Sequence, residues 1–128
     1  MKTMTIATLT AAFLMLAMTG PALGDPPARP TVEVLFARQV QDRKPVDPAT
    51  TFSPGKLYCW TRLTSREGNY LIAHHWLKNG RRVWHQPIEV RGKQWVTWSQ
   101  FKVTPGSWTV RVTDEAGLVL HSAGFTVQ

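Results

Sequence analysis

The chain has one cysteine and few acidic residues. Cys59 has no second cysteine to pair with, so no intramolecular disulfide can form. Because Cys59 alternates with Leu57 and Leu63 in an apolar stretch, we expect a buried, unreactive thiol. Most of the eight acidic residues lie beside turn signals, which offers little for acid–base or triad chemistry. There is also no glycine-rich phosphate loop or nucleophile elbow. We therefore expect a protein that is not an enzyme and has no cofactor.

Long hydrophobic runs are scarce, and the longest lies at the N-terminus. Lys2 is followed by an uncharged apolar or small stretch over residues 4–18, shorter than the roughly 18–20 residues that span a bilayer. A Gly-Pro pair then breaks the run, and Ala-Leu-Gly places small residues before Asp25. This pattern predicts a signal peptide over residues 1–24, with cleavage near Gly24. An uncleaved membrane anchor is the alternative. We expect a periplasmic or secreted protein that meets the membrane only through its transient signal peptide.

The remaining chain is long enough for one domain. Residues 25–30, DPPARP, are too rich in proline for a helix or central strand and predict an extended tether. Residues 31–128 then form the predicted domain. The formal net charge is +7, with basic residues scattered along the chain. No nucleic acid is expected outside the cytoplasm, whereas cell-wall polymers, acidic glycans and lipid headgroups are attracted by a net positive field.

Apolar residues recur at every second position, which predicts strands and no helix. Asn79-Gly80 is a strong hairpin signal, and residues 41–56, with three prolines, predict a long connection. The hairpin order favours antiparallel pairing throughout. We expect an all-β, antiparallel two-sheet sandwich of immunoglobulin-like character with about seven to eight strands; a small barrel is the alternative. The predicted strands cover residues 31–40, 57–63, 70–78, 81–90, 94–101, 108–114 and 118–127.

Two segments, HHWLKNGRRV and QWVTWSQFKVTPGSWTVRVTDEAGLVLHSAGFTV, resemble the bacterial family named domain of unknown function 2914. The matching motifs are His74–Trp76, Trp95 with Ser99, Gly106–Val110, Asp114–Gly117 and Phe125–Val127. Upstream, QVQDRKPVDPATTF and LYCWTRL look like the family's opening, so the resemblance covers most of residues 33–127. His75 departs from the pattern and carries no family-based role. The resemblance implies an exported or membrane-tethered all-β domain and brings no assigned activity.

Three of the four histidines lie in the predicted hairpin. Adjacent strand residues point to opposite faces, so His74 and His75 cannot both ligate one metal ion without a bulge. Counting outward from the two-residue turn places His74 opposite His85, close enough to share zinc or copper. A zinc site needs further ligands, for which His121 and Glu89 are candidates. The alternative is a hydrogen-bonded His74 beside a solvated His85.

Basic and aromatic residues gather near the same turn. The predicted register sets His75 opposite Trp84, and the candidate binding surface consists of Lys78, Arg81, Arg82, Trp84 and His75. Aromatic rings beside arginine suit stacking on sugars or cation–π contacts. The alternatives are a solvated charged turn and an arginine that covers an aromatic edge.

The other tryptophans are divided between core and surface. Trp76, Trp108 and either Trp95 or Trp98 alternate with aliphatic residues, which predicts core positions. Trp60 alternates with charged or polar neighbours, so we expect it to be partly exposed, as we do Trp84.

These patterns predict an exported, non-catalytic binding or assembly module of the cell envelope. Its expected partner is a protein or an anionic envelope polymer, met by the hairpin. The alternatives are a metal-binding periplasmic domain that uses the His74/His85 pair, a glycan-binding module, and a domain that adds its free edge strand to a larger complex.

Overall fold

The computed structural model describes residues 29–66 and 68–128. The predicted signal peptide and most of the predicted tether lie outside them. The described residues form no helix, and so none that is long and apolar enough to cross a membrane. They form ten strands: β1 (Thr31–Ala37), β2 (Gln39–Gln41), β3 (Lys44–Val46), β4 (Thr51–Phe52), β5 (Gly55–Thr64), β6 (Tyr70–Lys78), β7 (Arg81–Val90), β8 (Gln94–Val103), β9 (Gly106–Asp114) and β10 (Val119–Val127).

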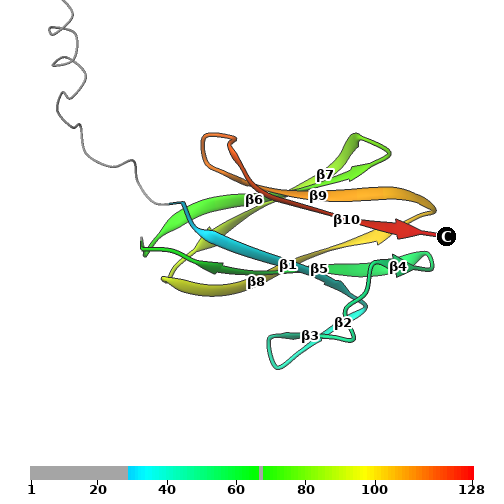
Figure 1. Cartoon of the computed structure of the whole chain (residues 1–128), viewed down its shortest axis with the longest axis horizontal. Helices are drawn as coiled ribbons and strands as arrows, with labels where there is room; N and C mark the ends of the chain where they lie inside the picture. The colour runs from blue at the N-terminus through cyan, green and yellow to red at the C-terminus, as the bar shows by residue number, and fades with distance from the viewer. Residues whose placement is uncertain (1–28, 67) are drawn as a thin grey trace, which may run out of the picture.

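The strands form two main sheets and one small hairpin (Figure 1). One sheet has the order β1-β5-β8, the other β4-β10-β9-β6-β7, and β2 pairs only with β3. All pairs are antiparallel except β4 and β10, which are parallel with Thr51 opposite Thr126. The expectation of antiparallel pairing throughout is therefore wrong. A parallel pair needs a long crossover only when its strands follow each other along the chain, whereas β4 and β10 are far apart in sequence.

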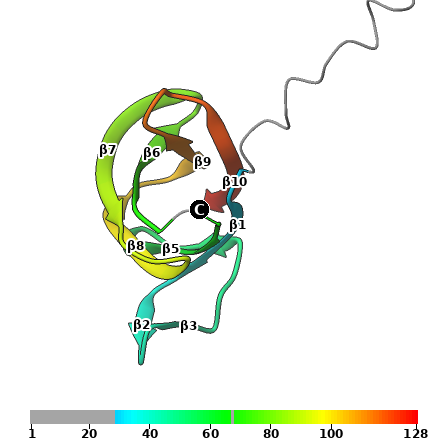
Figure 2. The same cartoon turned by 90° about the vertical axis from the view of Figure 1, so that its left-hand side faces the viewer.

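The two main sheets share a buried core, which makes the fold all-β and β-sandwich-like. Trp76 lies at its centre, with Leu57 and Cys59 from one sheet and Trp108 and Phe125 from the other. Figure 2 shows β5 and β8 on one side and β6 and β9 on the other. Side chains alternate between the two faces of a strand, so every second residue of each sheet faces the other sheet and contributes to the shared core.

Ten strands occur where seven or eight were expected, because the predicted connection is itself folded. Asp42 and Arg43 have φ angles of 51° and 63°, the left-handed geometry of a tight hairpin turn, and they join β2 to β3. Pro45 is tolerated because this two-stranded hairpin has no further neighbour that needs its N–H. Prolines therefore limit these strands to edge positions without excluding them.

The β6–β7 hairpin has the predicted ends and an unpredicted bulge. Asn79 and Gly80 have φ angles of 49° and 84°, so the two-residue turn is confirmed. Beyond the turn, Leu77 pairs with Arg82 but Trp76 pairs with Trp84, which leaves Val83 without a partner. This one extra residue changes which side chains share a face.

Candidate functional site

The bulge overturns the predicted cross-strand pair. His85 lies opposite His75, and His74 lies opposite Gln86. A shift of one residue moves side chains to the other face of a sheet, so His74 points into the core whereas His85 lies on the outer face beside His75. His74 and His85 therefore cannot share a metal ion. Among residues 29–66 and 68–128, no group of three His, Cys, Asp or Glu side chains is placed to hold one.

His74 links the two sheets through a buried polar network. Its side chain is 0% exposed, with Nε2 at 2.9 Å from the Thr61 hydroxyl and Nδ1 at 2.6 Å from the Ser99 hydroxyl. The Trp76 indole N–H donates to the same Ser99 oxygen over 3.0 Å. Burial, together with the nearby charge of His75, lowers the pKa of His74 from 6.5 to about 4. His74 is therefore neutral at physiological pH.

The Ser99–His74 contact resembles the start of a catalytic triad but lacks the rest of one. The second nitrogen of His74 meets a threonine hydroxyl, whereas a triad base is usually oriented by a carboxylate. Ser99 is 6% exposed and already accepts a hydrogen bond from Trp76. Such a network suits a structural role, since a satisfied buried polar group specifies one packing arrangement.

Cys59 matches its predicted environment. It is fully buried beside Thr61, and burial raises the pKa of its thiol to about 12. A thiol that stays protonated is a poor nucleophile.

The opposite face of the hairpin carries a cluster that we call the basic histidine face, formed by His75, His85, Arg82 and Arg111. The two imidazoles stack with ring centroids 5.8 Å apart and 15° between their planes. Arg82 Nη1 lies 3.2 Å from His75 Nδ1, and a guanidinium can only donate. Nδ1 is therefore the acceptor, so the ring proton of neutral His75 lies on Nε2 and donates to the Thr113 hydroxyl over 2.9 Å.

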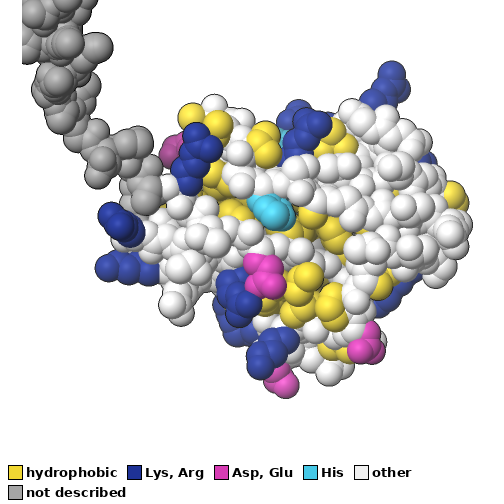
Figure 3. All heavy atoms as spheres, in the orientation of Figure 1, with side chains coloured by type: hydrophobic (Ala, Val, Ile, Leu, Met, Phe, Trp, Pro, Cys, Tyr) yellow, Lys and Arg dark blue, Asp and Glu magenta, His cyan; other side chains and the backbone are white. Residues whose placement is uncertain are grey.

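Positive charge dominates this face. Partial burial first, and then the charges of Arg82, His85 and Arg111, lower the pKa of His75. Arg111 pairs with His75 across β9 and β6. The ion pairs of the described chain lie elsewhere, between Arg62 and Glu33 and between Arg91 and Glu89. On the side of the molecule that Figure 3 presents, which is a different one, Lys and Arg side chains are scattered over the surface with a few Asp and Glu side chains among them. An anion would relieve the repulsion within the cluster.

The structure separates the five predicted binding residues. His75 and Arg82 touch each other on the basic histidine face. Lys78 donates to the Thr104 hydroxyl over 2.7 Å near the turn, and Arg81 is exposed beside it. Trp84 lies on the other face of β7.

The tryptophans follow the prediction only in part. Trp76 and Trp108 are buried and Trp84 is 44% exposed, as expected. The prediction for Trp60 is wrong, since it is only 4% exposed. Its indole N–H donates to the Arg43 carbonyl over 2.9 Å, so the β2–β3 hairpin covers it. The sequence could not reveal this cover because the hairpin itself was expected to be a connection.

Arg111 was not among the predicted binding residues. It belongs to β9, far along the chain from the hairpin, and joins His75 only because β9 pairs with β6. Arg111 lies between Val110 and Val112, which are both buried. Because side chains alternate between the two faces of a strand, this position indicates that Arg111 lies on the outer face.

Fold and surface together define a β-sandwich-like domain with a basic outer face. The family described as "Protein of unknown function (DUF2914)" matches residues 69–127. Residues 69–127 therefore belong to this family, as the motifs within them predicted. The matched residues include β6, β7 and β9 and therefore the whole basic histidine face, whereas β1 to β5 precede them. A comparison with curated proteins finds no match.

Proposed function

We propose that this protein is an exported, non-catalytic binding module of the cell envelope, and that its basic histidine face holds an anionic envelope polymer. The observation that carries the proposal is the gathering of Arg82, Arg111 and the stacked His75/His85 pair on three neighbouring strands. Guanidinium groups present planar pairs of donors that match phosphate and carboxylate oxygens. Export is supported by the N-terminal sequence pattern.

A polymer suits this face better than a compact acidic protein does. Arg82 of β7 and Arg111 of β9 lie on either side of His75 of β6, and neighbouring strands are about 4.8 Å apart. A linear chain with regularly spaced charges can meet such a row with successive groups. An acidic envelope protein is the second candidate, because it would be attracted by the same charges.

The test uses long-chain polyphosphate as the probe and two double variants of equal charge. Arg82→Gln with Arg111→Gln removes two positive charges from the face. Arg62→Gln with Arg91→Gln removes two charges elsewhere. By calorimetry at about 0.15 M salt, where the Debye length is about 8 Å, the first pair should weaken binding about tenfold or more, or at least 1.4 kcal/mol. The second should change it by less than about twofold, since distant exposed charges are screened.

Equal losses in both double variants would mean that polyphosphate responds only to net charge, which would overturn the proposal. The proposal would also be overturned if the Arg82→Gln, Arg111→Gln variant still bound polyphosphate while the Arg62→Gln, Arg91→Gln variant did not. Both variants change exposed positions, and a urea unfolding curve of each shows that the fold is retained.

We also propose that the sandwich is immunoglobulin-like. The three-stranded and five-stranded sheets with one core between them support this grouping. An experimental structure in which hydrogen bonds join β1 to β10 and β7 to β8 in one closed barrel would contradict it.

A further inference from the structure

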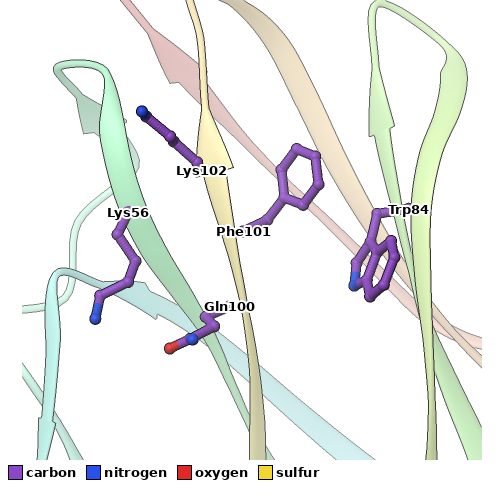
Figure 4. A pocket seen from close by; sticks show the side chains of 5 residues that line it. All are labelled: Lys56, Trp84, Gln100, Phe101 and Lys102. Atoms are coloured by element: carbon purple, nitrogen blue, oxygen red, sulfur yellow. The ribbon is translucent and has the colours of Figure 1, made fainter.

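A groove runs between β7 and β8, which are edge strands of the two main sheets. It consists of two hollows of about 450 and 640 Å³ that share Trp84 and Gln100. Figure 4 shows Trp84 of β7 and Phe101 of β8 pointing toward each other across the space between the strands. We call this the aromatic groove. It lies on the other face of β7 from His85, so it is separate from the basic histidine face.

Two exposed tryptophans line the aromatic groove. Trp84 is 44% and Trp98 is 37% exposed, and both contact the larger hollow. Phe101 supports Trp84 from behind, with ring centroids 6.4 Å apart, and itself packs against the buried Trp76 at 5.8 Å. An exposed ring held in place by the core is prepared to stack on a flat partner with little loss of conformational entropy.

The two edges discourage an added β-strand. Pro87 has no N–H and lies in the middle of β7, a usual protection of an edge, and its carbonyl accepts a bond from the Gln86 amide. On β8, Arg43 donates to the Val96 carbonyl over 2.9 Å and lies over the Trp98 ring at 5.9 Å. Recognition here therefore depends on side chains more than on backbone pairing.

The charged and polar residues of the aromatic groove indicate the ligand. Lys56 and Lys102 line the smaller hollow, and neither hollow is lined by a carboxylate. Gln86 and Gln100 supply amides that can both donate and accept hydrogen bonds. A sugar ring has an apolar C–H face, which stacks on an aromatic ring, and hydroxyl groups at its edge, which suit amides. The lysines complement an acidic substituent.

We propose that the aromatic groove binds a linear acidic oligosaccharide. Its sugar rings stack on Trp84 and Trp98, and the chain continues over the edge of β8, so that its carboxylates reach Lys56 and Lys102, whose side chains point away from Trp84 (Figure 4). This site is independent of the proposed polymer site, because no residue of the basic histidine face lines either hollow.

Matched short probes test the proposal. A β-1,4-linked mannuronate hexamer carries one carboxylate per ring, β-1,4-mannohexaose has the same linkage without charge, and hexaglutamate has the charge without sugar rings. By calorimetry the mannuronate hexamer should bind about tenfold tighter than either of the others, a difference of 1.4 kcal/mol. The indole N–H signals of Trp84 and Trp98 should shift in NMR spectra on its addition.

Four variants locate the site. Trp84→Ala should weaken mannuronate binding about tenfold, whereas Trp84→Phe, which keeps a ring, should retain most of it. Lys56→Gln with Lys102→Gln should reduce the preference over mannohexaose without touching a buried residue. Leu118→Ala removes an equally exposed apolar side chain at a distant turn and should change nothing.

Three results would overturn the proposal: equal affinity for hexaglutamate, equal affinity for mannohexaose, or unchanged mannuronate binding in Trp84→Ala. The Arg82→Gln, Arg111→Gln variant separates the two proposed sites. It should retain mannuronate binding in the aromatic groove even though it loses polyphosphate, so either proposal can fail without the other.

Discussion

Acid should destabilise the protein through His74, and the structure sets the size of the effect. The buried imidazole has a pKa of about 4 in the folded chain, against 6.5 when unperturbed. The unfolded state therefore binds a proton at a higher pH than the folded state does. At 1.36 kcal/mol per pKa unit, this difference amounts to about 3 kcal/mol. That stability is fully present above pH 6.5 and is lost as the pH falls toward 4.

Urea unfolding at pH 7.5, 6.0, 5.0 and 4.0 measures this loss. In His74→Gln the amide can still meet the hydroxyls of Ser99 and Thr61 but does not titrate. We expect this variant to be less stable than the wild type at pH 7.5, because the imidazole packing is lost. Its unfolding free energy should fall by about 3 kcal/mol less than that of the wild type between pH 7.5 and 4.0.

The matched control is His121→Gln, which removes a histidine that lies only half-buried on β10. It should keep the acid sensitivity of the wild type. If His74→Gln loses as much free energy on acidification as the wild type does, the assignment of a neutral buried imidazole is wrong. If His121→Gln abolishes the loss of unfolding free energy at low pH, the group responsible for it is His121 and not His74.

Two further predictions concern the buried serine and the N-terminus. Ser99→Ala leaves the Trp76 indole N–H and His74 Nδ1 without the hydroxyl that they contact, and should lower the unfolding free energy by about 1–3 kcal/mol in urea. It should leave polyphosphate affinity unchanged; an unchanged unfolding curve would argue against the network. Mass spectrometry of protein recovered from the cell envelope should find Asp25 as the first residue. Recovery of a chain that retains residues 1–24 would refute cleavage.

The local pattern was enough to locate most strands. β6 and β7 have the predicted ends, and the turn between them uses the left-handed conformations that Asn79 and Gly80 favour. The buried face of β6 also follows from alternation, with Ile72, His74 and Trp76 all inside. These features depend on residues within a few positions of one another, so a single sequence carries the information.

The candidate sites were predicted less well because they depend on distant contacts. Because of the bulge at Val83, His85 lies opposite His75 and not opposite His74 as predicted. Counting alternate residues outward from the turn gives no sign of an extra residue in one strand. Arg111 joined the histidines through the pairing of β9 with β6. Trp84 was predicted to lie with the basic residues, but it lies in the aromatic groove because its ring faces Phe101 of the other sheet.

The sequence by itself determined the all-β class, the hairpin, the family of residues 69–127 and the buried thiol, because alternation, turn chemistry and ordered motifs are local properties of the chain. Only the tertiary structure decided the strand pairing of β4, the cover over Trp60 and the division of the predicted basic and aromatic surface into two faces. Those outcomes arise where segments far apart in sequence meet. Their free energy comes from burial and pairing between sheets, which no local pattern of residues records.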